Sequence, residues 1–256
     1  VASPDSSIGD IAAAVEKDPR MAAEILRMAN SAAYIRLGRA TNAKAAVARL
    51  GLRHVHNLAQ TIFLQGLCDV REGPYKTLLS MVWRRSVARA LSMRALCDLL
   101  DPLHALNGNT AYMIGLMSDI GASLLLWVAS ERLPGNLTVD DVRDTGALLD
   151  VVRKSHEQLA AAMLVRWNFE KVIVLSCSQH HAATPPVTNP LWWSLSVLGD
   201  HLASMLIPGD DPTSTNPRSR SMVERCAAEF CLPSTVLGRL LDQLKDEFAA
   251  VEGGKI

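Results

Sequence analysis

The sequence is poor in aromatic residues. Only 5% of its 256 residues are aromatic, whereas 49% are hydrophobic, mainly Ala, Leu, Val and Met. Ala, Leu and Met favour helices, and Ile, Phe and Tyr, three of the residues that favour strands, are few. This length and apolar share are ample for a packed core. The composition therefore predicts an all-α globular protein.

An excess of charge of one sign is also missing. Lys and Arg together number 26, and so do Asp and Glu. A chain without net charge has no bulk field to attract a polyanion or an acidic membrane surface. We therefore expect neither nucleic acid nor a membrane as its partner.

Paired cysteines and long hydrophobic runs are absent too. The cysteines are odd in number, widely spaced and without a CxxC pair: Cys68, Cys97, Cys177, Cys226 and Cys231. This pattern argues against a disulfide framework and a zinc knuckle, so we expect buried, reduced thiols. No apolar run reaches the roughly 18 residues of a membrane span, and the polar start VASPDSSIGD is unlike a signal peptide. These absences predict a cytoplasmic protein, and the start at Val1 suggests a piece of a longer chain.

Helix start and stop signals are frequent near the N-terminus. Ser6 or Ser7 can cap a first helix that ends near Lys17, and Pro19 suits the first turn of the next helix. Gly51 is predicted to end a third helix. Breaks at Gly73-Pro74 and in the polar stretch 207–219 then divide the chain.

These breaks define the expected organisation. We predict one two-lobed helical domain over residues 1–206, with an N-terminal lobe at about 6–72 and a second lobe at about 73–206. Residues 207–256 are expected to be a linker followed by C-terminal helices that pack on the domain.

The second lobe is expected to open with two long helices. They run through about 75–100 and 110–130, with a loop around 101–109 between them. The run VIVLSC at 172–177 has the composition of a strand, but polar helix signals flank it. We therefore predict a helix there.

Several histidines are candidates for a metal site. The pair His180-His181 and the isolated His156 lie on predicted helices, and imidazole is a common ligand of transition metals. Asp119 and Asp200 lie on other helices and are the carboxylates that would join them. An isolated histidine on a helix is more often structural, so residue types alone favour the structural interpretation.

Six segments, taken in order, resemble the HDOD domain family, a degenerate relative of the HD and HD-GYP phosphohydrolases. They are DPRMAAEILRMANSAAY, AVARLGLRHVHNLA, VWRRSVARA, AYMIGLMSDIG, SHEQLAAAMLVRW and SQHH. The match covers about residues 5–205. It implies an all-α, two-lobed fold and a signalling role without catalysis.

The resemblance also indicates what an active HD enzyme would need. It would have a histidine near Arg85 and a His-Asp pair where this chain has Ser118-Asp119. A guanidinium does not lose its proton in proteins, so Arg85 would oppose a divalent cation. We therefore expect no catalysis, no metal and no cofactor, and we expect Arg85 to form an ion pair with Asp119.

The donors that remain in this vestigial pocket are Asp119, His156, His180 or His181, and Asp200. Four such donors are enough for one zinc ion, but loss of the His-Asp pair removes the bridging arrangement of two-metal hydrolysis. Hydrolysis is therefore not expected.

Two further sets of residues have a structural and a functional interpretation. The basic run Arg84, Arg85, Arg89 and Arg94 is expected to be a solvated helix face, the alternative being a phosphate site that joins Arg85 to His180 and His181. The five tryptophans are expected in the core or between lobes, with one of Trp192 and Trp193 exposed.

Asn30-Ser31 belongs to the family motif, as does Gly51. Asn and Ser favour helix ends, where their side chains bond to nearby backbone, so a structural role is preferred. The alternative is that Asn30 ties the N-terminal lobe to the rest of the domain.

Together these observations predict a non-enzymatic signalling or regulatory module of a bacterial cytoplasm that acts through protein–protein interaction. The alternative is a metal-dependent phosphohydrolase or a nucleotide sensor that uses the residual pocket.

Overall fold

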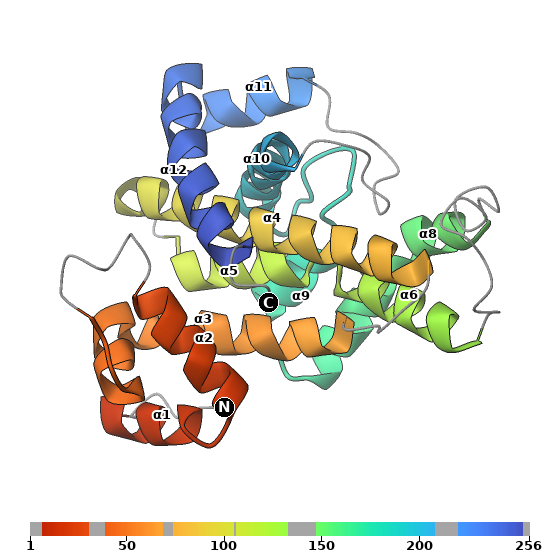
Figure 1. The fold of residues 1–256 in the computed structure, drawn as a ribbon. Helices are drawn as coiled ribbons and strands as arrows, with labels where there is room; N and C mark the ends of the chain where they lie inside the picture. The colour runs from red at the N-terminus through yellow and green to blue at the C-terminus, as the bar shows by residue number, and fades with distance from the viewer. Residues whose placement is uncertain are drawn as a thin grey trace. The chain divides into compact units, whose positions relative to one another are not determined.

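A computed structural model describes residues 7–30, 39–68, 74–104, 106–132, 147–207 and 220–252. Within these ranges every regular element is a helix and no strand occurs (Figure 1). The all-α prediction is therefore confirmed. Ser31 and most of the linker at 207–219 lie outside the described residues.

The chain divides into two compact units. One comprises Val1–Gln65 together with Asp246–Ile256, and the other comprises Gly66–Lys245. The predicted domain limits stay a prediction, because this division concerns packing alone.

The first unit is built on α1 (Ile8–Val15), α2 (Pro19–Ala29) and most of α3 (Ala43–Cys68). Ser7 caps α1 with a capping box, in which its hydroxyl accepts from the amide of Asp10 and the Asp10 carboxylate accepts from the amide of Ser7. Such a box satisfies two amides that the helix leaves open. The buried faces of these helices share one apolar core, which includes Val15, Ile25, Ala46, Val47, Val55 and Ile62.

Helix α3 is interrupted at Gly51. This residue has φ +79° and ψ 154°, a backbone conformation that is open to glycine and strained for other residues. The sequence predicts a helix end at this position, and the chain turns there before the helix resumes.

Asn30 fixes the chain that enters α3. Its Nδ2 donates to the carbonyl of Ala40 at 2.9 Å, and the amide of Ala40 donates to its Oδ1 at 2.8 Å. Arg49 adds a bond to the carbonyl of Ala29 at 2.9 Å. These bonds lie within the first unit, which agrees with the structural role expected for Asn30.

We expect Asn30→Ala to lower the free energy of unfolding by about 1–3 kcal/mol, because it leaves two backbone groups of Ala40 without their partner. Urea denaturation followed by circular dichroism measures this change. Asn42→Ala is the comparison, since Asn42 Oδ1 accepts only the exposed helix-capping bond from the amide of Ala45, and its loss should cost less, about 1 kcal/mol. An equal loss in both variants would contradict a stabilising role for the two hydrogen bonds between Asn30 and Ala40.

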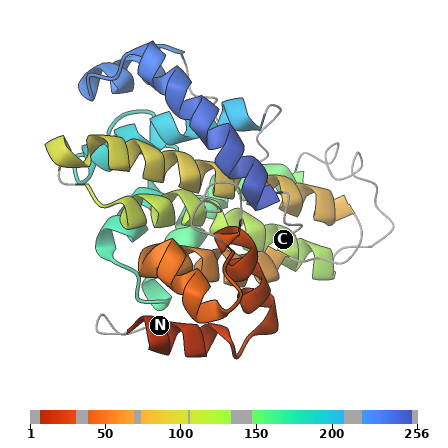
Figure 2. The same cartoon turned by 60° about the vertical axis from the view of Figure 1, so that its left-hand side comes forward.

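The second unit contains the remaining helices (Figure 2). They are α4 (Pro74–His104), α5 (Gly108–Met117), α6 (Ile120–Arg132), α8 (Ala147–Arg166), α9 (Lys171–Ser178), α10 (Pro190–Leu206), α11 (Arg220–Glu229) and most of α12 (Ser234–Glu252). Helix α4 packs against α5, α6 and α10, and α8 packs against α6 and α9. Long helix α4 is therefore the element around which this unit is assembled.

Two predicted boundaries in this unit are wrong. The helix expected over 110–130 is divided by the turn residues Ser118 and Asp119, and α4 continues to His104 through part of the predicted loop. The run VIVLSC lies in α9, so its assignment as a helix is confirmed. The stretch Gly108–Arg132 is long and apolar enough for a membrane span. However, 72% of its apolar 18-residue segment is buried within the structure, as expected of a core segment.

Glycines allow the helices around the turn at 118–119 to approach closely. A Cβ atom on Gly121 of α6 would lie 2.1 Å from the carbonyl oxygen of His156 in α8. On Gly115 of α5 it would lie 2.7 Å from the backbone of Ala90 in α4. The chain thus brings α4, α6 and α8 together at one place.

We predict that Gly121→Ala lowers the free energy of unfolding by about 1–3 kcal/mol, because the added methyl group meets rigid backbone. Gly238→Ala in α12 is the matched control, since its Cβ would meet nothing within 4 Å. There, alanine should leave stability unchanged or raise it by about 0.5–1 kcal/mol. Thermal denaturation of both variants compares them, and similar melting temperatures would count against the close approach.

The burial of the cysteines and tryptophans differs in part from the sequence-based expectation. Cys97, Cys177 and Cys226 are buried free thiols, as expected, but Cys231 is exposed. Trp127 and Trp167 are 41% and 40% exposed, so the core expectation is wrong for both.

Candidate functional site

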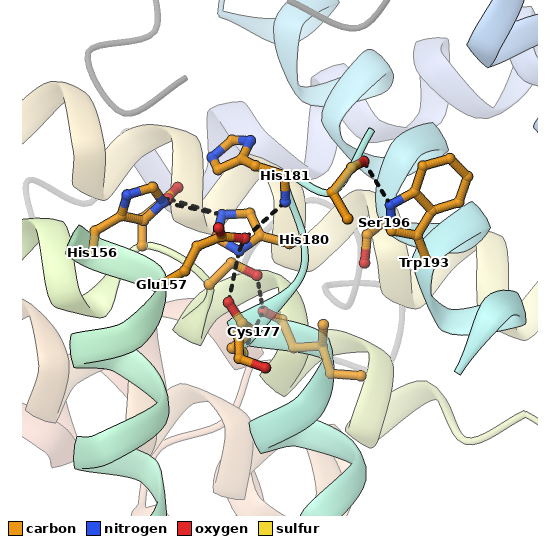
Figure 3. A network of polar contacts seen from close by, with 12 residues as sticks. His156, Glu157, Cys177, His180, His181, Trp193 and Ser196 are labelled. Atoms are coloured by element: carbon orange, nitrogen blue, oxygen red, sulfur yellow. Dashed lines mark hydrogen bonds and ion pairs between the residues drawn. The ribbon is translucent and has the colours of Figure 1, made fainter. Parts of the chain in front are cut away.

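The second unit brings four of the predicted pocket residues together. Asp119 comes from the turn between α5 and α6, His156 from the middle of α8, and His180 and His181 from just beyond α9. One ligand atom from each lies within 4.8 Å of the others. Figure 3 shows the three imidazole rings grouped together, and the centroids of His180 and His181 are 4.1 Å apart.

The cation beside Asp119 is Arg89. Its Nη1 donates to Asp119 Oδ2 at 2.6 Å and its Nε donates to Asp200 Oδ1. The guanidinium side chain is 3% exposed, and the carboxyl groups of Asp119 and Asp200 are 1% and 11% exposed. Arg89 therefore joins α4 to the turn after α5 and to α10 through a buried ionic network.

The expected pair between Arg85 and Asp119 is wrong. Arg85 lies one helical turn earlier on the same face of α4, and its Nη2 lies 3.4 Å from the carbonyl oxygen of Ile207. The prediction of a solvated basic face also fails at Arg85 and Arg89, which are both buried. Sequence reasoning noted that the two arginines share a face, but it did not identify which of them reaches the aspartate.

Ser118 plays a local part. Its hydroxyl is buried and donates to the carbonyl of Ile114 at 2.6 Å, within the turn of helix that precedes Asp119. Ser118, where the resemblance implies a histidine in an active HD enzyme, is thus bonded to its own helix.

Backbone carbonyls fix the orientation of two histidines. Nδ1 of His156 is 2.9 Å from the carbonyl oxygen of Val152, and Nδ1 of His180 is 2.8 Å from that of Cys177. A carbonyl only accepts, so each Nδ1 carries a proton and, in the neutral ring, each Nε2 carries a lone pair. The two Nε2 atoms are 3.4 Å apart.

Burial and the neighbouring charges shift the pKa values of all four clustered residues. Burial raises the pKa of Asp119, but the Arg89 guanidinium and the adjacent histidines outweigh burial and hold it well below its ordinary value. Burial lowers the pKa of His156. For His180 the lowering by burial is outweighed by Asp119, so its pKa lies above its ordinary value. Burial and the neighbouring His180 lower the pKa of His181.

These residues fit one divalent ion and do not fit a pair. Asp119 Oδ1 and the imidazoles of His156, His180 and His181 form a donor set suited to a transition metal. On the other side, Asp119 Oδ2 and Asp200 Oδ1 are engaged by Arg89, which leaves Asp119 unable to bridge a second ion. A pair of ions about 3.5–4 Å apart, as two-metal hydrolysis uses, would have to share this carboxylate.

The arrangement defines an all-α protein with a buried cluster of histidine and aspartate side chains. The family model of the HDOD domain matches residues 1–183. The chain belongs to the HDOD domain family.

Solved structures share this fold. One is a proposed metal-dependent phosphohydrolase from Shewanella amazonensis SB2B, with a TM-score of 0.68 and 20% identity over 96% of this chain and 87% of the other. Another is a proposed signal transduction protein from Marinobacter aquaeolei VT8, with a TM-score of 0.69 and 21% identity over 98% of this chain and 55% of the other. A third is an HDOD domain protein of unknown function from Geobacter sulfurreducens, with a TM-score of 0.65 and 18% identity over 97% and 87%.

A curated relative is longer than this chain. An uncharacterized protein from Treponema pallidum (strain Nichols) is 23% identical over 245 residues, which are 92% of this chain and 45% of the relative. The chain thus spans less than half the length of that relative.

Replacing Arg89 by methionine should lower the free energy of unfolding by about 3–5 kcal/mol, because it removes the guanidinium from the buried carboxylate of Asp119 and from the partly buried one of Asp200. Arg84→Met is the control, since Arg84 lies exposed on the same helix. Arg89→Lys should restore only part of the loss, because one ammonium cannot reproduce the fork that serves both aspartates. Denaturant titration of the three variants measures this order, and equal stability of Arg89→Met and Arg84→Met would contradict it.

Proposed function

We propose that this chain is a non-enzymatic regulatory module of a bacterial signalling system, located in the cytoplasm, that acts by binding another protein. The observation that carries the proposal is the pairing of Arg89 with both Asp119 and Asp200. The Arg89 guanidinium engages the carboxylate oxygens that would otherwise be available to bridge a pair of metal ions.

The electrostatics of this pairing oppose hydrolysis. Arg89 keeps its charge at every accessible pH, so Asp119 Oδ2 is not released by titration of its partner. A second divalent ion on this side would also meet the guanidinium charge in a buried environment, where screening is weak. Without a bridged pair of ions, the site lacks the clamp for attacking and leaving oxygens.

The surface and the comparisons support a role in binding. Adjacent Trp127 and Val128 on α6 are 41% and 43% exposed, and Val165 and Trp167 near the end of α8 are 64% and 40% exposed. Tryptophan is enriched in protein interfaces. Membership of the HDOD family and the fold shared with a proposed signal transduction protein support a signalling role.

The test is a phosphodiesterase assay in excess Mn²⁺, with bis-p-nitrophenyl phosphate and cyclic dinucleotides as substrates, on protein purified without added metal or chelator. We expect turnover equal to that of the His156→Ala variant, because the site lacks a bridged metal pair. Turnover well above background that His156→Ala abolishes would overturn the proposal in favour of a metal-dependent phosphohydrolase. Thermal stabilisation by a nucleotide without turnover would instead identify a sensor, since a ligand of the native state raises apparent stability.

A further inference from the structure

We infer that Asp119, His156, His180 and His181 bind one divalent transition-metal ion of the Zn²⁺ class, on the side of Asp119 that faces away from Arg89. The ion would stabilise the second unit and would take no part in turnover. The inference therefore goes beyond the proposed function, and metal binding can be tested independently of turnover.

Three of the donor atoms have the spacing of a metal site. The Nε2 atoms of His156 and His180 are 3.4 Å apart, and Asp119 Oδ1 lies 3.7 Å from the first and 3.4 Å from the second. Ligands at about 2.0–2.1 Å from a tetrahedral Zn²⁺ are separated by about 3.3–3.4 Å. The triangle of donors thus nearly has the dimensions of one face of a zinc coordination shell.

The protonation of these atoms also favours an ion between them. Because both Nδ1 atoms donate to backbone carbonyls, the neutral rings of His156 and His180 direct two lone pairs toward the same point as the carboxylate. Asp119 Oδ1 is buried and accepts no hydrogen bond. Three converging lone pairs in a buried place repel one another unless a metal ion or a proton lies between them. Histidines that ligate a metal commonly donate their other N–H to such an acceptor.

His181 supplies the fourth donor. Both of its ring nitrogens are buried without a hydrogen-bond partner, which is unusual for a buried imidazole. Its backbone amide donates to Glu157 Oε1 at 2.9 Å, which holds the residue beside His180 (Figure 3). Three imidazoles and one carboxylate oxygen are a donor set typical of Zn²⁺.

The competing occupant of this space is a proton shared between His180 and Asp119, whose atoms are 3.4 Å apart. A proton and a metal ion differ in stoichiometry, spectrum and response to chelator. Metal titration therefore separates them.

The experiment is a titration of chelator-stripped, tag-free protein with Zn²⁺ in competition with a chromophoric chelator, and with Co²⁺ followed by its visible absorption. We expect one Zn²⁺ per chain, the intense absorption of four-coordinate Co²⁺, and a higher melting temperature with Zn²⁺. His156→Ala should weaken Zn²⁺ binding by at least about 100-fold, since losing a ligand costs no less than losing its supporting hydrogen bond. His201→Ala, a histidine of α10 outside the cluster, should bind like the wild type.

His181→Ala keeps the test decisive if His156→Ala does not fold, because His181 is the least buried of the four. It should also weaken Zn²⁺ binding and shift the Co²⁺ spectrum, because water would take the place of the lost imidazole. Absence of stoichiometric Zn²⁺ binding, or equal binding by His181→Ala and His201→Ala, would overturn the inference. Phosphodiesterase turnover by the Zn²⁺-loaded protein would contradict the proposed function and leave the metal site standing.

Discussion

The interior of the second unit depends on a cation placed against a buried carboxylate. Asp119 is 1% exposed, and an ionised carboxylate is costly to bury without a partner. Arg89 supplies that partner from 30 residues earlier in the chain and also binds Asp200, 111 residues after itself. One guanidinium thus joins three elements that no local signal connects. Its planar fork suits this task, because two of its nitrogens serve two different acceptors.

The two oxygens of Asp119 divide the site into two halves. Oδ2 belongs to the ionic network with Arg89, whereas Oδ1 faces the imidazoles of His156 and His180. The first half supplies its own cation, so it can hold the helices together without any ion from solution. The second half presents lone pairs and has no such fixed charge. The same carboxylate can therefore serve packing on one side and ligand binding on the other.

Local signals predicted the elements well, and long-range partners less well. The cap at Ser7 and the break at Gly51 follow from the chemistry of single residues, and the structure contains both. The grouping of Asp119 with His156 and with His180 or His181 was anticipated from residue types and family resemblance. The structure adds both histidines of the pair, and it places Asp200 on Arg89 instead. The role of Arg89 was missed because Arg85 and Arg89 share one helix face, and only the depth of packing decides which one reaches Asp119. Sequence periodicity identifies a face, but it does not give the position along the helix that meets the turn.

The break between α5 and α6 shows a similar limit. Apolar residues continue on both sides of Ser118-Asp119, so the pattern indicated a single helix, yet the turn is what presents the carboxylate. Its position depends on close backbone approaches at Gly115 and Gly121, which bring α4 and α8 to the same point. A larger side chain at either glycine would move a helix that carries Arg89 or His156. The geometry of the polar cluster is therefore set by the absence of side chains beside it as much as by the charged residues within it.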